Sequence, residues 1–339
     1  MLYRRFGNTS VETSVLGIGG TVFGKLYGQF DEKEATCALK YALERGINSI
    51  DTAYWYGQGA SECFIGNALK GVPRERYFIA TKVARYEKEA TRMFDFSAEK
   101  VTKSAQESLE RLQLDYVDLL QVHDVEFAPS IDVVIESTLP ALQRLKERGL
   151  CRYIGITGYP LSTLRAIVDK SPVKIDSVLS YCRLTLQDSS LTNEFSYYKA
   201  RGVALINASP VGMGLLTEGG KGIPQWHPAS PETKKAAIDA SKYCSEHGVD
   251  ITRLALNYSA SFKEVATTLV GMTTKAMVDS NIEASCLPLT KKEAEVRDYI
   301  KRAFFDPLKS KHWEGVELEK YRRKVQAVQD KSHPNQTLV

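Results

Sequence analysis

Residues 17–24 read GIGGTVFG and end a short apolar run, TSVLGIG, that is typical of a buried strand. An open, doubly wound α/β sheet that binds a dinucleotide carries G-x-G-x-x-G in the turn after such a strand, and a helix begins there at once. Here the glycines have a different spacing, and the next helical pattern begins only at Asp31. The stretch therefore argues against an open sheet.

Strand-like and helix-like segments alternate on both sides of this stretch. The segment DEKEATCALKYALERG has one apolar helical face, with Asp31 as its N-cap and Gly46 as its stop. Counting the first run, eight apolar runs, each followed by a helical pattern, occupy about 270 residues, which predicts an α/β (β/α)8 barrel, a TIM barrel. A long helical stretch is expected near 232–262.

Both ends of the chain extend this barrel. The segment LYRRFGNTSVETS predicts a β-hairpin around Gly7 and Asn8 that closes the bottom of the barrel. The segment WEGVELEKYRRKVQAVQ predicts a C-terminal helix, and the last residues, DKSHPNQTLV, should fray. We therefore predict a barrel domain over residues 1–315 and a C-terminal helix with a flexible tail over 316–339.

Composition narrows the class of protein. The chain has 339 residues, 43% of them hydrophobic and 25% charged, with a formal charge of +4. Interspersed charges of this size give no electrostatic case for nucleic acid or an anionic membrane. The chain has no apolar run of about 20 residues and no secretory h-region. Its six scattered cysteines form no C-x-x-C pair, so we expect reduced thiols, no metal site and a cytoplasmic location.

Ionisable residues stand where consecutive strands end. Asp51 and Tyr56 follow the strand in NSIDTAYWYG, Lys82 ends YFIATK, and His123 lies in LLQVHD. In a TIM barrel these strand ends meet at one face. Asp51 would then pair with the buried ammonium of Lys82, which would lower the pKa of Tyr56 and make it an acid/base group.

Each of these residues also has a structural interpretation. His123 could be a satisfied structural histidine, Lys82 could extend its head to water, and Tyr56 could be a rim residue. Asp51 could cap a turn. Four ionisable groups at consecutive strand ends favour a catalytic site over these separate explanations.

The motif GINSIDTAYWYG, followed by IATK and LLQVHD, resembles the signature of the aldo-keto reductase family, over roughly residues 1–290. The resemblance implies a catalytic tetrad of Asp51, Tyr56, Lys82 and His123. It also implies a nicotinamide dinucleotide bound in extended form. The implied cofactor contacts are Gly20, Thr21, Asp51, Thr157, Gly158, Ser180, Ser209, Val211, Gly212, Gly271, Met277 and Asn281.

The resemblance also bears on which dinucleotide binds. Family members that use NADP place cations around the 2′-phosphate, because a dianion needs charge-assisted partners. The two matching positions here are Gly271 and Met277, and Lys275 is the cation left nearby. This pattern predicts NAD in preference to NADP, with Asn281 reaching the adenine.

Other strings, among them FDFSAE, ASPVGMGLLTE and QWHPASPE, resemble the branch of that family that oxidises L-galactose in the sugar-lactone route to ascorbate. This implies a small sugar substrate, oxidised at its anomeric C1–OH to a lactone with formation of NADH. Candidate sugar contacts on the loops are Tyr54, Trp55, Asp124 and His227.

Two other functions remain open from the sequence. One is an NADPH-dependent carbonyl reductase that runs the same chemistry in reverse. The other is a cofactor-sensing regulatory subunit, because the potassium-channel β-subunits resemble this fold. The oligomeric state is not predicted.

Overall fold

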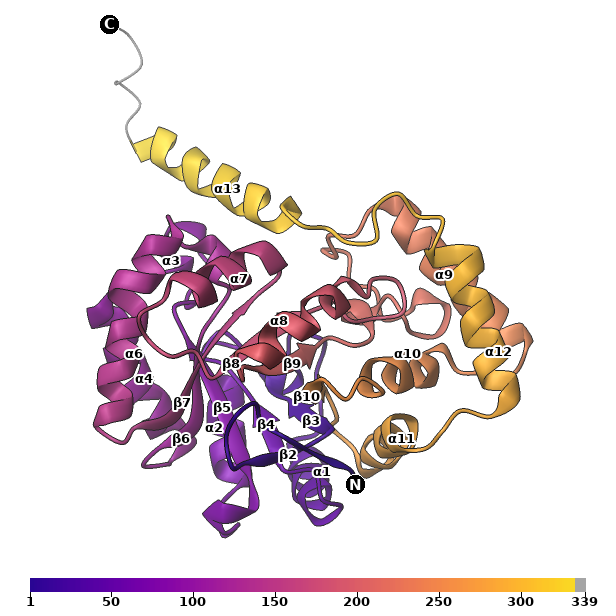
Figure 1. The fold of residues 1–339 in the computed structure, drawn as a ribbon, viewed down its shortest axis with the longest axis horizontal. Helices are drawn as coiled ribbons and strands as arrows, with labels where there is room; N and C mark the ends of the chain where they lie inside the picture. Colours follow the sequence, from indigo (N-terminus) through magenta and orange to yellow (C-terminus); the bar gives the residue numbers. More distant parts are fainter. Residues whose placement is uncertain (333–339) are drawn as a thin grey trace, which may run out of the picture.

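The structure, a computed structural model, describes residues 1–332. Within them, eight parallel strands form a closed barrel in the order β10-β3-β4-β5-β6-β7-β8-β9, and the pairing of β3 with β10 closes it. Helices surround the barrel (Figure 1). The predicted (β/α)8 fold is confirmed.

The elements are as follows. The barrel strands are β3 (Leu16–Gly19), β4 (Ser49–Asp51), β5 (Phe78–Val83), β6 (Val117–Val122), β7 (Cys151–Gly158), β8 (Ser177–Tyr181), β9 (Ala204–Ala208) and β10 (Val265–Val270). The α-helices are α1 (Glu32–Glu44), α2 (Ala60–Ala68), α3 (Ala90–Met93), α4 (Ala98–Leu112), α5 (Ile131–Val133), α6 (Leu139–Glu147), α7 (Leu161–Lys170), α8 (Phe195–Ala200), α9 (Pro231–Glu246), α10 (Ile251–Ala260), α11 (Lys275–Cys286), α12 (Lys291–Ile300) and α13 (Val316–Ser332). Among these described helices, none is long and apolar enough to cross a bilayer.

The predicted N-terminal hairpin is present and closes the bottom of the barrel. Strands β1 (Tyr3–Arg5) and β2 (Glu12–Ser14) pair in antiparallel fashion. Phe6, next to the turn, is fully buried, and its ring centroid lies 4.8 Å from that of Phe78 inside the barrel. Gly7 has a positive φ of 55°, and a Cβ there would lie 2.6 Å from the Gly202 carbonyl oxygen, so only glycine fits this turn.

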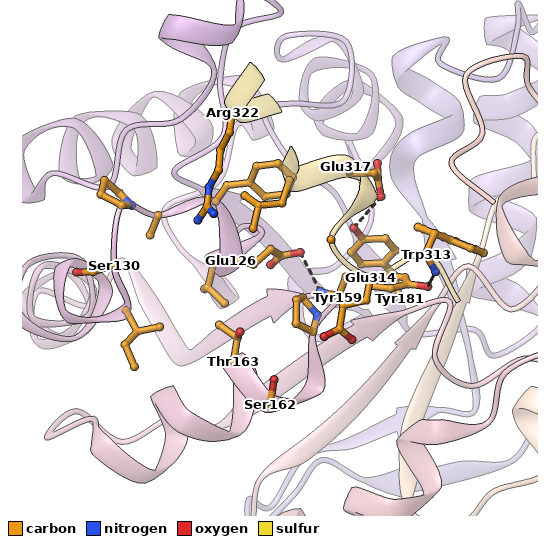
Figure 2. A pocket seen from close by; sticks show the side chains of 18 residues that line it. Glu126, Ser130, Tyr159, Ser162, Thr163, Tyr181, Trp313, Glu314, Glu317 and Arg322 are labelled. Atoms are coloured by element: carbon orange, nitrogen blue, oxygen red, sulfur yellow. Dashed lines mark hydrogen bonds between the residues drawn. The ribbon is translucent and has the colours of Figure 1, made fainter. Parts of the chain in front are cut away.

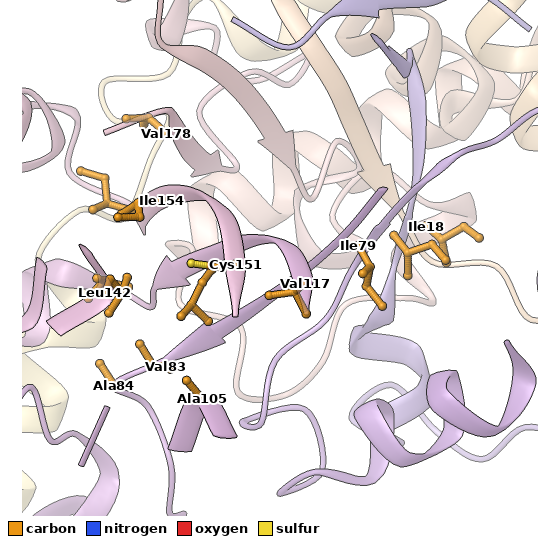
Figure 3. Close-up of a cluster of buried hydrophobic side chains, with 14 of the residues drawn as sticks. Ile18, Ile79, Val83, Ala84, Ala105, Val117, Leu142, Cys151, Ile154 and Val178 are labelled. Atoms are coloured by element: carbon orange, nitrogen blue, oxygen red, sulfur yellow. The ribbon is translucent and has the colours of Figure 1, made fainter. Parts of the chain in front are cut away.

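Alternation along the strands decides which side chains enter the barrel. On β6, Leu120 and Val122 face outward and pack against the helices, whereas Leu119 faces the barrel interior. Part of the outward layer is shown in Figure 3, where Ile154 of β7 and Val178 of β8 belong to the same buried cluster as Leu142 of α6. Burying such side chains stabilises the fold by about 1.5–3 kcal/mol each. The same alternation turns the catalytic candidates on these strands inward.

One prediction about the second half of the chain is wrong in detail. The stretch near 232–262 is two helices, because Gly248 adopts a positive φ of 63° after α9. Asp250 then caps α10 by accepting a hydrogen bond from Thr252 N. Further along, Thr290 caps the regular helix α12 with a capping box.

The predicted C-terminal helix is α13, and the segment before it is anchored to the barrel. Trp313 N donates to Tyr159 Oη at 3.1 Å, and the two rings stack. Tyr321 packs edge-on against Phe94 and Phe127. The segment therefore lies over the C-terminal ends of the barrel strands. The predicted frayed tail falls beyond the described residues, except at its start.

Candidate active site

A cavity of about 490 Å³ opens at the C-terminal ends of the barrel strands. Its wall includes residues at the ends of β3, β4, β5, β8 and β10, the loop after β9, and Glu317 of α13. Asp51, Tyr56, Lys82 and His123 all line it. The four residues predicted to form a catalytic group are thus brought together in one cavity of ligand-binding size.

Lys82 is the centre of this group. Its ammonium is 2% exposed and donates hydrogen bonds to the Asp51 carboxylate, to Thr52 O at 2.8 Å and to Tyr56 Oη at 3.2 Å. Gln121, which faces inward on β6, donates from Nε2 to Asp51 Oδ2 at 2.8 Å. A buried ammonium needs such a paired carboxylate, so Asp51 holds Lys82 charged beside the phenol.

The electrostatics of Tyr56 correct the sequence expectation. Lys82 does lower the pKa of this phenol, as predicted, and so does a hydrogen bond with Thr21. Burial is the larger influence, however, and it raises the pKa above its ordinary value. The prediction of a lowered pKa is therefore wrong for the cofactor-free site, because it left out the desolvation of the phenolate. At neutral pH Tyr56 carries its proton.

His123 is neutral in this environment. Burial lowers its pKa to about 3, and the charges of Lys82 and Arg85 act in the same direction. Its ring stands perpendicular to that of Tyr56, with centroids 5.9 Å apart. Within residues 1–332, the buried Nδ1 has no hydrogen-bond partner. A neutral imidazole here can hydrogen-bond a substrate oxygen beside the Tyr56 hydroxyl without adding charge.

An ion pair next to His123 continues the wall of the cavity. Asp124 has a left-handed φ of 49° and is fixed by a hydrogen bond from its N to Thr157 Oγ1 at 3.0 Å. Arg85 Nη1 donates to Asp124 Oδ2 at 2.5 Å. The guanidinium lies over the Trp55 ring, 4.2 Å from its centroid. Sequence reasoning found Asp124 and Trp55 but missed Arg85.

The structure separates the other predicted residues into two sets. Those that line the cavity are Thr21, Trp55, Asp124, Thr157, Ser209, Val211, Gly271, Met277 and Asn281. Those that do not are Gly20, Tyr54, Gly158, Ser180, Gly212 and His227. The second set lies outside the lining of this cavity.

Most of the residues outside the cavity lining are there for a physical reason. Ser180 and Gly158 have the outward parity of their strands, since Leu179 and Thr157 are the inward neighbours. Gly158 is covered by Glu126, whose Oε2 would lie 2.6 Å from an added Cβ. Gly20 packs closely against Asp51 O. Tyr54 instead stacks under the Arg111 guanidinium.

His227 is a structural histidine. Its Nδ1 accepts from Ala229 N at 3.0 Å, and its Nε2 lies 2.9 Å from Gly212 O, to which it donates. Both ring nitrogens are used, so none is left for a sugar hydroxyl. Gly212, which was predicted as a cofactor contact, lies in the loop that His227 stabilises through this hydrogen bond.

Helix α11 contributes an unpaired polar group to the cavity wall. Asn281 is almost fully buried and lines the cavity, yet its Nδ2 has no partner among the residues that the structure describes. An unpaired buried amide is costly unless a ligand satisfies it. Among the lining residues of the described chain, the lysine and arginine side chains are Lys82 and Arg85, both at the catalytic end.

Sequence reasoning missed Gln121, which holds Asp51 from inside the barrel, and several residues of the cavity wall. Gln121 could have been found from the inward parity of β6, and Tyr181 from that of β8. Tyr27 and Trp226, 6.2 Å apart by ring centroids, come from loops far apart in the sequence. No local signal places such loop residues together, and the same holds for Glu317.

Comparison with known proteins identifies the family of this chain. The Aldo/keto reductase family model matches residues 15–301. The chain is 47% identical over 284 residues to L-galactose dehydrogenase of Arabidopsis thaliana, covering 83% of this chain and 87% of that protein. It is 33% identical to D-arabinose 1-dehydrogenase of Saccharomyces cerevisiae, covering 88% and 93% of the two chains. The holo form of aldo-keto reductase AKR11C1 from Bacillus halodurans superposes with a TM-score of 0.71 at 29% identity, covering 88% and 96%. The chain is therefore a member of the aldo/keto reductase family.

Proposed function

We propose that this oxidoreductase oxidises an aldose, L-galactose first among the candidates, at the anomeric C1–OH to the aldonolactone, with NAD as the acceptor. The observation that carries the proposal is the placement of the Tyr56 hydroxyl between the Lys82 ammonium and a neutral His123. The choice of an aldose is supported by the similarity to two sugar dehydrogenases.

The residues of this chain would divide the work as follows. His123 hydrogen-bonds the C1 oxygen of the sugar and fixes it next to Tyr56. Tyr56 accepts the hydroxyl proton as a phenolate, which Lys82 stabilises, while Asp51 keeps Lys82 charged. A bound nicotinamide ring would accept the hydride from C1. The buried setting keeps water away from these groups and strengthens their interactions.

NAD rather than NADP is supported by the composition of the cavity wall. The residues around the unpaired Asn281 amide include Gly271 and Met277, which cannot pair with a phosphate through a charged side chain. Lys275 is directed toward the Tyr41 ring, 5.2 Å from its centroid. A 2′-phosphate would find little charge-assisted hydrogen bonding there.

One observation favours a second function. The raised pKa of Tyr56 keeps this phenol protonated at neutral pH, which suits a general acid that donates a proton to a carbonyl during reduction. An NADPH-dependent carbonyl reductase is therefore the alternative.

A panel assay separates the two functions. The purified protein is mixed with NAD or NADP and with L-galactose, L-fucose or D-arabinose, and formation of reduced cofactor is followed by absorbance. Rapid reduction of NAD with one of these sugars is expected. Absence of turnover with all of them, together with oxidation of NADPH by simple aldehydes, would replace the proposal with the reductase.

A further inference from the structure

Three charged side chains from distant parts of the chain line the same cavity as Tyr56 and His123. They are Arg85 after β5, Asp124 after β6 and Glu317 on the first turn of α13. Neither Arg85 nor Glu317 takes part in the acid/base chemistry described above. Charged groups at a cavity wall are expensive to desolvate, so their presence beside the reacting centre requires an explanation.

The Arg85–Asp124 pair is rigid. The short hydrogen bond between Arg85 Nη1 and Asp124 Oδ2 leaves other guanidinium N–H groups and the other carboxylate oxygen available to bind a ligand. Arg85 is held from the sides by the Trp55, Phe94 and Phe127 rings, at 4.2, 5.3 and 5.9 Å from their centroids. The pair therefore presents a fixed donor and a fixed acceptor side by side.

Glu317 approaches from the C-terminal segment. Figure 2 shows its carboxylate against the Tyr181 hydroxyl, which donates to Oε2 at 3.4 Å. The segment is anchored on the barrel by the Trp313–Tyr159 contact and by the ion pair of Glu314 with Arg183 at 2.8 Å. A carboxylate accepts up to about four hydrogen bonds, so the bond from Tyr181 leaves capacity for a ligand.

The balance of charge limits which ligands this wall accepts. Two carboxylates face one guanidinium, and His123 is neutral because burial lowers its pKa to about 3. Arg85 favours the charged form of Glu317 and opposes the effect of burial, which raises the pKa of this carboxyl. A ligand hydroxyl can donate to either carboxylate and accept from Arg85, whereas an anionic ligand meets an excess of negative charge.

We propose that Glu317 and the Arg85–Asp124 pair determine substrate specificity, by binding the ring hydroxyls of a neutral sugar and excluding sugars that carry a carboxylate. This inference rests on the proposed aldose oxidation. Adjacent donor and acceptor groups match adjacent hydroxyls, each of which is both donor and acceptor. The C-terminal segment thereby supplies part of the substrate site, and the barrel alone leaves it incomplete.

The test compares Glu317→Gln and Glu317→Ala with Glu319→Gln. Glu319 is on the same helix, exposed, and pairs with Arg323 away from the cavity. Steady-state constants are measured for the neutral aldose that the wild-type protein oxidises fastest, for the corresponding uronic acid, and for NAD. For both Glu317 variants we expect KM for the neutral aldose to rise roughly tenfold or more, as loss of a charged hydrogen bond predicts. The kcat should stay within about threefold, and the KM for NAD should not change.

The uronic acid gives a second readout that a merely structural role would not move. Its kcat/KM relative to the neutral aldose should rise in Glu317→Gln, because the repelling charge is gone. An unchanged KM for the neutral aldose in both Glu317 variants, or an equal change in Glu319→Gln, would overturn the inference while leaving the aldose oxidation intact. If the wild-type protein oxidises no aldose, the proposed function fails first and the inference with it.

Discussion

The buried acids at the bottom of the barrel differ from several polar groups at its top. At the bottom, Asp118 accepts from Arg74, Arg152 and Ile79 N, and Asp176 pairs with Lys146 and Lys174 and accepts from Ile154 N. At the top, His123 Nδ1, Arg85 Nε and Asn281 Nδ2 have no partner among the described residues.

This difference separates stability from function. A fully paired buried carboxylate ties the beginning of a strand to neighbouring elements, and nothing remains for a ligand to bind. An unpaired buried polar atom costs folding free energy, and a ligand can recover that cost on binding. In TIM barrels the bottom contributes stability and the top carries chemistry, and the hydrogen bonds of this chain follow that division.

The largest effect is expected from Tyr56→Phe at the top. Loss of the hydroxyl removes the proton acceptor, so kcat for aldose oxidation should fall by roughly 100- to 10,000-fold. NAD affinity and the free energy of unfolding should change little, since the hydroxyl hydrogen-bonds only Lys82 and Thr21 at the cavity wall. Steady-state kinetics, cofactor fluorescence titration and urea denaturation check the three quantities. Retention of most of the wild-type kcat would remove Tyr56 from its role.

The opposite result is expected from Asp118→Ala at the bottom. This change leaves Ile79 N–H buried without an acceptor and removes the partner of Arg74. The free energy of unfolding should fall by about 3 kcal/mol, in the range for lost hydrogen bonds to a charged group. The kcat of the folded fraction should stay near wild type. Asp115→Ala, an exposed acid close by, is the control and should have little effect on stability.

These contrasts show what the sequence could and could not predict. Asp51, Tyr56, Lys82 and His123 lie directly after or within apolar strand patterns, so strand parity and barrel topology suffice to bring them together. Asp118 and Asp176 at the bottom could be located in the same way. Most of their side-chain partners could not, because these come from loops and helices. Ser180 was assigned to the cofactor although its parity turns it outward, a result that the inward Leu179 and Tyr181 make plain.

Residues on loops and on the C-terminal segment were beyond sequence reasoning. Glu317 lies nearly 200 residues from Asp124 in the chain, and no periodicity links them. Similarly, His227 was predicted as a sugar ligand because a histidine can hydrogen-bond a hydroxyl. Its two hydrogen bonds to the backbone depend on the fold of one loop, which the sequence does not reveal. Desolvation, which decides the pKa of Tyr56, is likewise a property of the whole cavity.

A third variant, Lys82→Met, tests how Lys82 controls the protonation of Tyr56 at the top of the barrel. Lys82 lowers the pKa of Tyr56, and burial with Asp51 raises it. Removing the ammonium leaves the raising influences unopposed, so the pKa of Tyr56 should rise further. Aldose oxidation needs the phenolate, so kcat/KM of the variant should lie below that of the wild-type protein at every pH up to about 10, a range in which the phenol is mostly protonated in both. A pH series from 6 to 10 is about the usable range. Lys88→Met, an exposed lysine, should leave the profile unchanged, and an unchanged profile in Lys82→Met would contradict the coupling.

The smallest effect is expected from Met277→Arg, in the part of the cavity wall that α11 contributes. Met277 is exposed, lines the cavity and lies in the first turn of α11, where Thr274 Oγ1 accepts from its N at 3.1 Å. A guanidinium there could bind a 2′-phosphate, so NADP affinity should rise about tenfold with NAD affinity unchanged. Ser280→Arg, one turn along on the same helix and outside the cavity lining, controls for added charge. Dissociation constants for both cofactors measure the effect. Equal gains in NADP affinity for the two arginine variants would mean that long-range charge, and not a contact at position 277, discriminates between the cofactors. The top of the barrel would then select its cofactor through its overall electrostatic potential and not through side chains paired with the phosphate.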